Sequence, residues 1–197
     1  RPRIEIDPEW EVVGLGEVFK TASGGTPLRN RPEFYFDGSI PWLKSGEVAQ
    51  GYIYSSQEFI TELGMRNSSA KLFPVDTVLV AMYGATAGQV GILKAPMTTN
   101  QAVCGIYPNP ISIPEFLYYF LLTQTEIMVS MSTGGAQPNI SQRVIQELTV
   151  PLPDLDEQRK VVNELVNEQS LIQSNRDLIT RFEQKIRDRI ARVWGEG

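Results

Sequence analysis

The chain has 197 residues, of which 18 are basic and 23 acidic, 42% are hydrophobic, one is cysteine and none is histidine. This length suits one domain of ordinary size, or a domain with an appendage. The absence of histidine excludes Ser-His-Asp and Cys-His catalysis and H-E-x-x-H metal sites, and a single cysteine excludes an internal disulfide and a cysteine-rich zinc site. The net charge of −5 argues, at first sight, against a nucleic-acid partner.

Neither a targeting segment nor a membrane span is visible in the sequence. The first seven residues are charged and lack the apolar stretch of a signal peptide. The longest apolar run, 116–122, is far shorter than the roughly 20 residues that a membrane helix needs. We therefore expect a cytoplasmic protein. The chain opens on Arg1 without a methionine, which favours a piece of something longer.

The residues up to 153 carry the marks of mixed α and β structure. A helix is expected to begin at Ser112, with Ser112 as its cap and Glu115 closing a capping box, and its apolar residues 116–122 should be buried. A short helix should begin at Ser141, before a strand near 148–150. Because no helix alternates regularly with strands, we predict an α+β fold and not a doubly wound parallel sheet. Strand-like runs bounded by Gly, Pro or Asn lie at 77–83, 89–93 and 102–107.

From Asp154 onward no Gly or Pro appears until Gly195, which predicts one long helix with Asp154 as its N-cap. Apolar residues recur in it at the seven-residue spacing of a coiled-coil seam. The alternative, a helix folded back over its own domain, is unusual for helices longer than about 25 residues. We thus predict a globular domain, 1–153, and a helix, 154–197, that acts as spacer and dimerisation element. The residues expected to pair with another helix are Leu165, Ile172, Ile179, Phe182, Ile186 and Val193.

No catalytic constellation emerges from the motifs. The run Gly84–Gly88 is not followed by the lysine of a phosphate-binding loop. Asp177, Glu183 and Lys185 resemble a nuclease signature only superficially, because they lie on the predicted helix, where Glu and Lys form a solvated face. We expect no catalytic residue and no metal site. Cys104, inside an apolar run, is expected to be a small buried side chain.

The informative segments are turn-rich loops that carry amides, hydroxyls and isolated basic residues. Glycines let a backbone approach a ligand closely, and exposed N–H groups with Ser or Thr hydroxyls suit phosphate oxygens. Asn, Gln, Lys and Arg can read base edges in a major groove. The alternative is that each loop is only a tight turn that needs Gly, Pro and Asn. The loops are 23–31, 38–47, 83–88, 99–101 and 132–139.

Several short motifs occur in these loops and at the start of the helix, and together they span nearly the whole chain. They are Gly24-Gly-Thr-Pro27, Ile40-Pro-Trp-Leu-Lys-Ser-Gly-Glu47, Gly84-Ala-Thr-Ala-Gly88 with Gly91, Thr99-Asn-Gln-Ala102, Gln137-Pro-Asn-Ile-Ser141, and Val150-Pro-Leu-Pro153 running into Glu157-Gln-Arg159. The set and its order resemble the specificity subunit of type I restriction–modification systems, in particular one target recognition domain followed by its conserved helix.

The resemblance implies a mixed α/β domain that grips one half of a split site in double-stranded DNA. It also implies a long helix that packs antiparallel against the equivalent helix of a second half. That second half is either another copy of the chain or a covalent continuation, because the usual subunit has two domains and two helices. Modification subunits, which are methyltransferases, and restriction subunits would join the complex. S-adenosylmethionine, ATP and Mg would bind only to those partners, and this chain would neither methylate nor cut.

Residue roles follow from combining the resemblance with side-chain chemistry. Lys44 is the first choice for a phosphate or guanine contact, and base readers are also expected in the less motif-like loop 49–66. Trp10 and Trp42 are expected in the core. A different class of function, a coiled-coil adaptor that binds protein and not DNA, is kept as the alternative. The further candidates for DNA contacts are Ser45, Tyr83, Gly84, Thr86, Asn100, Gln101, Gln137, Asn139, Arg29 and Arg31.

The distribution of charge weakens the objection raised by the net charge. Residues 1–19 hold two basic and five acidic side chains, whereas residues 20–153 hold eight and nine. The predicted helix from 154 onward also holds eight and nine. The predicted recognition part is therefore close to neutral. A neutral domain attracts DNA weakly, so we expect poor DNA binding by the chain alone and strong binding by an assembled complex.

Overall fold

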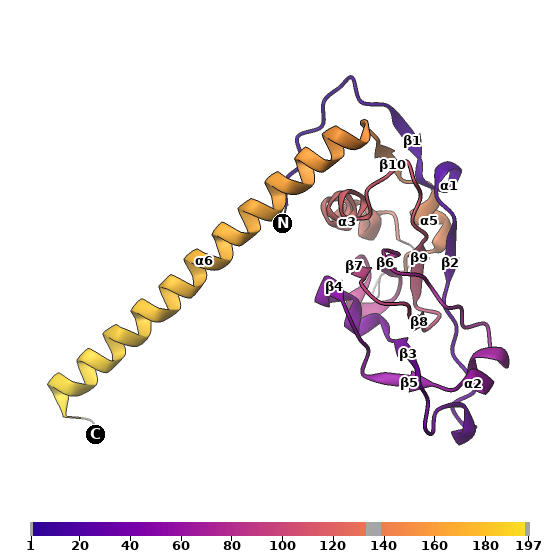
Figure 1. Ribbon diagram of the computed structural model, residues 1–197, viewed down its shortest axis with the longest axis horizontal. Coiled ribbons are helices and arrows are strands. Elements are labelled where there is room, and N and C mark those ends of the chain that lie inside the picture. The colour runs from indigo at the N-terminus through magenta and orange to yellow at the C-terminus, as the bar shows by residue number, and fades with distance from the viewer. Residues whose placement is uncertain (1, 133–138, 196–197) are drawn as a thin grey trace. The chain divides into compact units, whose positions relative to one another are not determined.

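The computed structural model of the chain describes residues 2–132 and 139–195. The chain divides into two compact units, Arg1–Arg159 and Lys160–Gly197. Among the described residues, all strands and all the shorter helices belong to the first unit, and the second is the continuation of one long helix (Figure 1). This α+β architecture with a long C-terminal helix confirms the predicted fold class.

The centre of the first unit is a five-stranded sheet with the strand order β2-β9-β6-β7-β4. Strand β4 runs parallel to β7, and the other neighbouring strands are antiparallel. Every residue of β6, β7 and β9 is buried, so both faces of the sheet are covered. These three strands confirm the three predicted strand runs. The sheet is built from β2 (Thr21–Ser23), β4 (Tyr52–Ile53), β6 (Val78–Ala81), β7 (Val90–Leu93) and β9 (Val103–Ile106).

Two smaller sheets complete the β structure of the described residues. In the three-stranded sheet, β3 lies in the middle, antiparallel to β5 and parallel to β8. In the two-stranded sheet, β1 from the start of the unit pairs antiparallel with β10 from its end. The predicted strand near residues 148–150 is confirmed as β10. The bounds are β1 (Val12–Gly14), β3 (Ile40–Leu43), β5 (Glu58–Ile60), β8 (Thr98–Thr99) and β10 (Thr149–Pro151).

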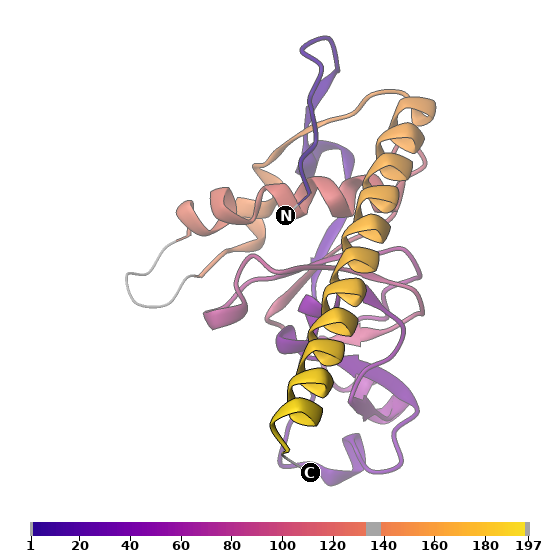
Figure 2. The ribbon, with the colours of Figure 1, turned by 90° about the vertical axis from the view of Figure 1, so that its left-hand side faces the viewer.

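Short helices and 3-10 turns connect these strands. Helix α3 packs against β6 and β7, and six of its apolar residues are buried, which confirms the buried helix predicted there. Helix α4 follows α3 after one residue (Figure 2). The helices are α1 (Leu15–Val18), α2 (Glu62–Arg66), α3 (Pro114–Thr123), α4 (Thr125–Ser130) and α5 (Gln142–Gln146), and the 3-10 turns are η1 (Pro32–Phe34), η2 (Ser45–Gln50) and η3 (Gly84–Thr86).

The predicted helix caps have different outcomes. Ser141 is confirmed as the cap of α5, because its side-chain oxygen accepts a hydrogen bond from the backbone N–H of Val144 at 3.2 Å. The cap predicted at Ser112 is wrong. The N-cap of α3 is Ile113, whose side chain offers no acceptor, and the Ile113 backbone N–H donates instead to the side chain of Gln158 at 2.8 Å.

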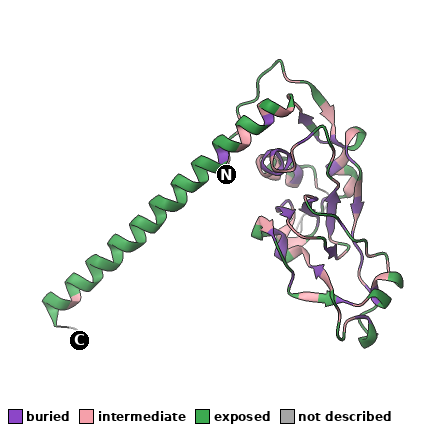
Figure 3. Ribbon diagram, viewed as in Figure 1, coloured by how far each residue is buried: buried purple, intermediate pink, exposed green. Residues whose placement is uncertain are grey.

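Trp42 is confirmed as a core residue, with 1% of its surface exposed. Trp10 is only half-buried and packs its ring edge-on against Phe116, with 6.4 Å between the ring centroids. Cys104 on β9 is confirmed as buried. Figure 3 shows how burial concentrates in the sheets and in α3.

The long helix is α6 (Leu155–Trp194), 40 residues without interruption, or about 60 Å at 1.5 Å per residue. Asp154 is confirmed as its N-cap, since one carboxylate oxygen accepts from the backbone N–H groups of Asp156 and Glu157, both at 2.9 Å. Every residue from 166 to 190 is exposed. Of the residues predicted to pair with another helix, Leu165 is buried, and Ile172, Ile179, Phe182, Ile186 and Val193 are exposed. Among the described residues, none of the helices is apolar over enough of its length to span a bilayer.

Candidate functional site

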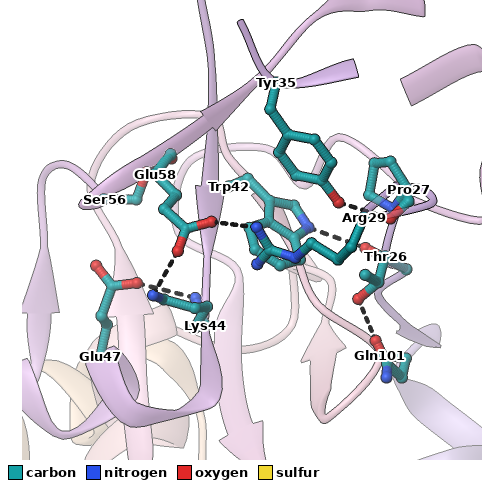
Figure 4. A network of polar contacts seen from close by, with 11 residues as sticks. Thr26, Pro27, Arg29, Tyr35, Trp42, Lys44, Glu47, Ser56, Glu58 and Gln101 are labelled. Carbon is teal, nitrogen blue, oxygen red and sulfur yellow. Dashed lines mark hydrogen bonds and ion pairs between the residues drawn. The ribbon is translucent and has the colours of Figure 1, made fainter. Parts of the chain in front are cut away.

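Two of the predicted DNA contacts, Arg29 and Lys44, meet on the carboxylate of Glu58 (Figure 4). The Lys44 ammonium lies 2.6 Å from Glu58 Oε1, and Arg29 Nη1 lies 2.8 Å from Glu58 Oε2. The hydrogen bonds from Lys44 and then Arg29 hold the pKa of Glu58 below its usual range. Glu58 is therefore ionised near neutral pH. Arg29, Lys44 and Glu58 together carry one positive charge in excess, and the carboxyl group of Glu47 lies next to the Lys44 backbone.

The pairing of β3 with β5 brings this group together. Trp42 and Glu58 are direct partners in the antiparallel register, and Lys44 follows two residues after Trp42. A buried carboxylate, that of Glu47, then fixes the start of η2. It accepts from the backbone N–H of Lys44 and from that of Gln57, each at 2.9 Å. Ser45, the first residue of η2, is half-buried beside Lys44.

The loop that follows β2 supplies Arg29 and contacts the turn at 99–101. The hydroxyl of Thr26 donates to the side-chain oxygen of Gln101. Gln101 is exposed, so the structure brings it close to the loop that carries Arg29. Asn100 is half-buried and its side-chain oxygen accepts from the backbone N–H of Ala102 at 3.2 Å. The Asn100 side chain therefore closes its own turn.

A second group of predicted residues surrounds η3. Tyr83 is 41% exposed and forms an isolated antiparallel bridge with Asn139. The hydroxyl of Thr86 donates to the Tyr83 carbonyl at 3.2 Å, which closes the turn. Gly84 has φ +69° and open space around its Cα, so glycine is needed there for backbone conformation and not for packing. Gln137 lies outside the described residues. Turns η2 and η3 lie against one another.

Arg31 stands apart from both groups. Its Nε lies 2.6 Å from Glu33, two residues further along the chain, and its guanidinium lies over the ring of Phe34. Both of these contacts of Arg31 are therefore with residues two or three positions further along the chain. The nuclease-like residues on α6 do not converge either, since Glu183 pairs with Arg187 and Lys185 lies over Phe182. No cluster of three or more metal-ligating side chains occurs among the residues that the structure describes.

Two residues of the site, Glu58 and Thr26, were not predicted from the sequence. Glu58 lies in the segment 49–66, where base readers were expected on the ground that it was less motif-like. No local signal marked Glu58 itself, because its partners Lys44 and Arg29 lie 14 and 29 positions away. Thr26 belongs to a quoted motif but was not assigned a role.

The sequence pattern of the family described as "Type I restriction modification DNA specificity domain" matches residues 8–184 of the chain. Among curated proteins, the specificity subunit of the type I restriction enzyme MjaIX from Methanocaldococcus jannaschii is 32% identical over 177 residues, which are 87% of this chain and 40% of that protein. The EcoR124I/EcoR124II specificity subunit from Escherichia coli is 28% identical over 163 residues, 80% of this chain and 40% of that protein.

Solved structures show the same fold. A chain from the structural study of complex assembly and conformational transition of the type I R-M system has a TM-score of 0.71 at 21% identity, covering 93% of this chain and 44% of that one. The HsdS subunit from Thermoanaerobacter tengcongensis has a TM-score of 0.63 at 19% identity, covering 88% and 40%. The chain thus spans about two fifths of the length of the curated relatives it matches. Since the family pattern covers both the globular unit and most of α6, the chain belongs to the family of type I restriction modification DNA specificity domains.

Proposed function

We propose that the chain recognises one half of a bipartite site in double-stranded DNA, as the specificity element of a type I restriction–modification complex. The observation that carries this proposal is that two motif-bearing loops bring Arg29 and Lys44 together on Glu58 at the surface, and that a third motif-bearing turn contacts the loop of Arg29. Arg29 and Lys44 share the carboxylate of Glu58, and Gln101 accepts from Thr26, three residues before Arg29. Cations and amides of this kind supply phosphate and base contacts in DNA complexes.

The near-neutral charge of residues 20–153 limits what the chain does alone. Non-specific DNA binding comes almost entirely from phosphate neutralisation by Lys and Arg. A recognition domain with a charge near neutral therefore depends on partner subunits for further phosphate contacts. We propose that these partners are a methyltransferase subunit and a restriction subunit, which also bind S-adenosylmethionine, ATP and Mg. The chain then directs chemistry in the cytoplasm without catalysing it.

The exposed apolar row on α6 supports the second part of the proposal, pairing with another long helix. Ile172, Ile179 and Ile186 repeat at seven-residue spacing, and each is at least half exposed. Such a row in water favours a partner that covers it. The partner we propose is the equivalent helix of a second specificity half, provided by another copy of the chain or by a covalent second half.

The test is DNA binding by the complex assembled with a type I methyltransferase subunit, measured on a plasmid fragment at several salt concentrations. The wild-type complex should lose affinity steeply with salt. Lys44→Ala should weaken binding and reduce the slope of log affinity against log salt by about 1. Arg187→Ala is the matched control, because Arg187 pairs with Glu183 on α6, outside every loop proposed to contact DNA.

The site assignment is wrong if a complex lacking Lys44, Gln101 and Asn139 side chains retains full site recognition. The DNA-reading function itself is wrong if the wild-type chain captures no methyltransferase subunit and the mixture shows no sequence preference. That second outcome would favour the adaptor alternative, since a coiled-coil adaptor has no reason to bind a methyltransferase.

A further inference from the structure

The guanidinium of Arg29 is held from several directions, although half of its side chain is exposed. Its Cζ lies 4.5 Å from the centroid of the Trp42 ring and 4.7 Å from that of Tyr35. Its Nη1 lies 2.8 Å from the Glu58 carboxylate, and 52% of the side chain is exposed. Figure 4 shows Arg29 extending across Trp42 toward Glu58. The planar group is therefore fixed in orientation but open to a ligand.

The groups that hold Arg29 are themselves fixed. The Trp42 indole N–H donates to the Gly25 carbonyl at 2.9 Å, and the Tyr35 hydroxyl donates to the Pro27 carbonyl at 2.6 Å. The two rings meet edge to face, with 6.1 Å between their centroids. Both hydrogen bonds return to the loop that carries Arg29. The aromatic support and the loop thus form one closed unit.

Arg31 provides a direct comparison two residues away. Its side chain is 54% exposed, as much as that of Arg29, but among the described residues its ion pair is with Glu33, and it lies over one ring, that of Phe34, at 5.3 Å. A flexible, point-like cation is enough to contact a phosphate. A fixed plane with two parallel donors matches the O6 and N7 acceptors of a guanine edge. The guanidinium of Arg29 is thus held in a more fixed orientation than a phosphate contact needs.

Arginine has five N–H donors, and the contact with Glu58 through Nη1 leaves enough of them for two parallel hydrogen bonds. A pre-oriented side chain also loses less conformational entropy when it binds. Glu58 stays ionised because Lys44 and Arg29 lower its pKa. Its second oxygen is held by Lys44, so the carboxylate cannot turn away from Arg29 without breaking that contact.

We propose that Arg29 is a specificity-determining residue that reads a guanine in the target half-site, with Glu58 and Trp42 as its positioning residues. This proposal rests on the proposed function, and it changes the role expected for Arg29 from a phosphate contact to a base contact. It assigns at least one G·C pair to the recognised half-site. Arg31 keeps the role of a phosphate contact.

The experiment is selection from a random-sequence duplex library by the complex assembled with its methyltransferase subunit, followed by sequencing of the bound duplexes. The wild-type complex should enrich a motif with an invariant guanine. Arg29→Ala removes both the charge and the planar fork, so preference for that guanine should fall by about 5- to 150-fold while the other positions stay. Arg31→Ala should lower affinity for all sequences and leave the motif unchanged.

Glu58→Gln tests the positioning role, because it keeps an acceptor oxygen and removes the charge. This substitution should weaken the preference for the same guanine only. Total binding to random duplex should stay equal or rise, whereas an unfolded variant would lose binding. Thermal unfolding of each variant checks that the fold is intact. Arg29→Lys, which keeps the charge but loses the planar fork, should weaken preference for the guanine less than Arg29→Ala does.

Three outcomes separate the hypotheses. If Arg29→Ala and Arg31→Ala both leave the motif unchanged, Arg29 reads no base, and this proposal is overturned while the proposed function stands. A wild-type motif without any G·C pair overturns it equally. If the wild-type complex enriches no motif at all, the proposed function fails together with it.

Discussion

Gln158, in the first turn of α6, caps the N-terminus of α3 by accepting a hydrogen bond from the backbone N–H of Ile113 at 2.8 Å. The Gln158 amide nitrogen donates to the carbonyls of Ile111 and Pro153, at 3.0 and 2.8 Å. Gln158 is fully buried. One side chain thus satisfies three backbone groups and fastens the start of α6 to the loop before α3.

We predict that Gln158→Ala lowers the free energy of unfolding by about 3 kcal/mol, because it leaves buried backbone groups without partners. The measurement is urea unfolding followed by tryptophan fluorescence. Gln173→Ala is the matched control, since Gln173 is an exposed residue of the same helix whose amide donates to Asp177 on the helix surface. Equal effects of the two substitutions would show that the Gln158 contacts do not stabilise the unit.

The glycines of the motif Gly24-Gly25 serve close packing. A Cβ on Gly24 would overlap the backbone carbonyls of Thr99 and Asn100, so Gly24→Ala must displace the turn that carries Gln101. We predict a loss of about 2–4 kcal/mol in unfolding free energy together with weaker DNA binding by the assembled complex. Gly46→Ala is the control, because no atom lies within 4 Å of its added Cβ. A tolerated Gly24→Ala would contradict the close approach.

Cys104 should be unreactive in the folded chain. Burial raises the pKa of its thiol from an ordinary 9.0 to about 12, and the thiolate is the reactive form. We predict negligible labelling by a disulfide reagent at pH 8.5 in native buffer and complete labelling in urea. Rapid labelling of the native chain would show that β9 opens readily.

The same shift links stability to alkaline pH. The folded chain keeps the thiol proton to higher pH than the unfolded chain, so this contribution to stability is present below pH 9 and is lost as pH rises toward 12. Cys104→Ala removes the contribution. The unfolding free energy of the wild type should therefore fall relative to that of Cys104→Ala between pH 9 and 11. A constant difference between the two would contradict this link.

The parts of the fold that carry local signals are predictable from the sequence. The run 116–122 is apolar on all sides and becomes the buried α3, and the strands β6, β7 and β9 lie between turn residues. Asp154 caps α6 through neighbours two and three residues away. In each case the deciding interactions lie within a few positions of one another.

What the sequence could not reveal depends on strand register and on distant partners. Glu58 meets Lys44 and Arg29 only because β3 and β5 pair with Trp42 opposite Glu58, and no local pattern sets that register. The cap of α3 comes from Gln158, 45 positions away, so the local pattern wrongly indicated Ser112. The Asn100 side chain, a candidate for a DNA contact, accepts a hydrogen bond from the backbone N–H of Ala102 and so forms an Asx turn.

The exposed apolar row of α6 leads to the last prediction, that the chain self-associates through this helix. Burying residues such as Ile172, Ile179 and Ile186 against a second helix removes apolar surface from water. We expect dimers in analytical ultracentrifugation at micromolar concentration. Ile179→Lys should weaken dimerisation by about 100-fold or more, because it places a charge in the seam.

Gln184→Lys is the matched control for Ile179→Lys. Residue 184 lies five positions after residue 179, on the opposite side of the helix from the seam. Both substitutions place a lysine four residues before an acidic side chain, Glu183 for position 179 and Asp188 for position 184, so the two variants differ mainly in the face that is charged. Gln184→Lys should therefore leave the dimer intact. If the wild-type chain sediments as a monomer at high concentration, the partner of α6 is not a second copy, and a covalent second half becomes the expected occupant of the seam.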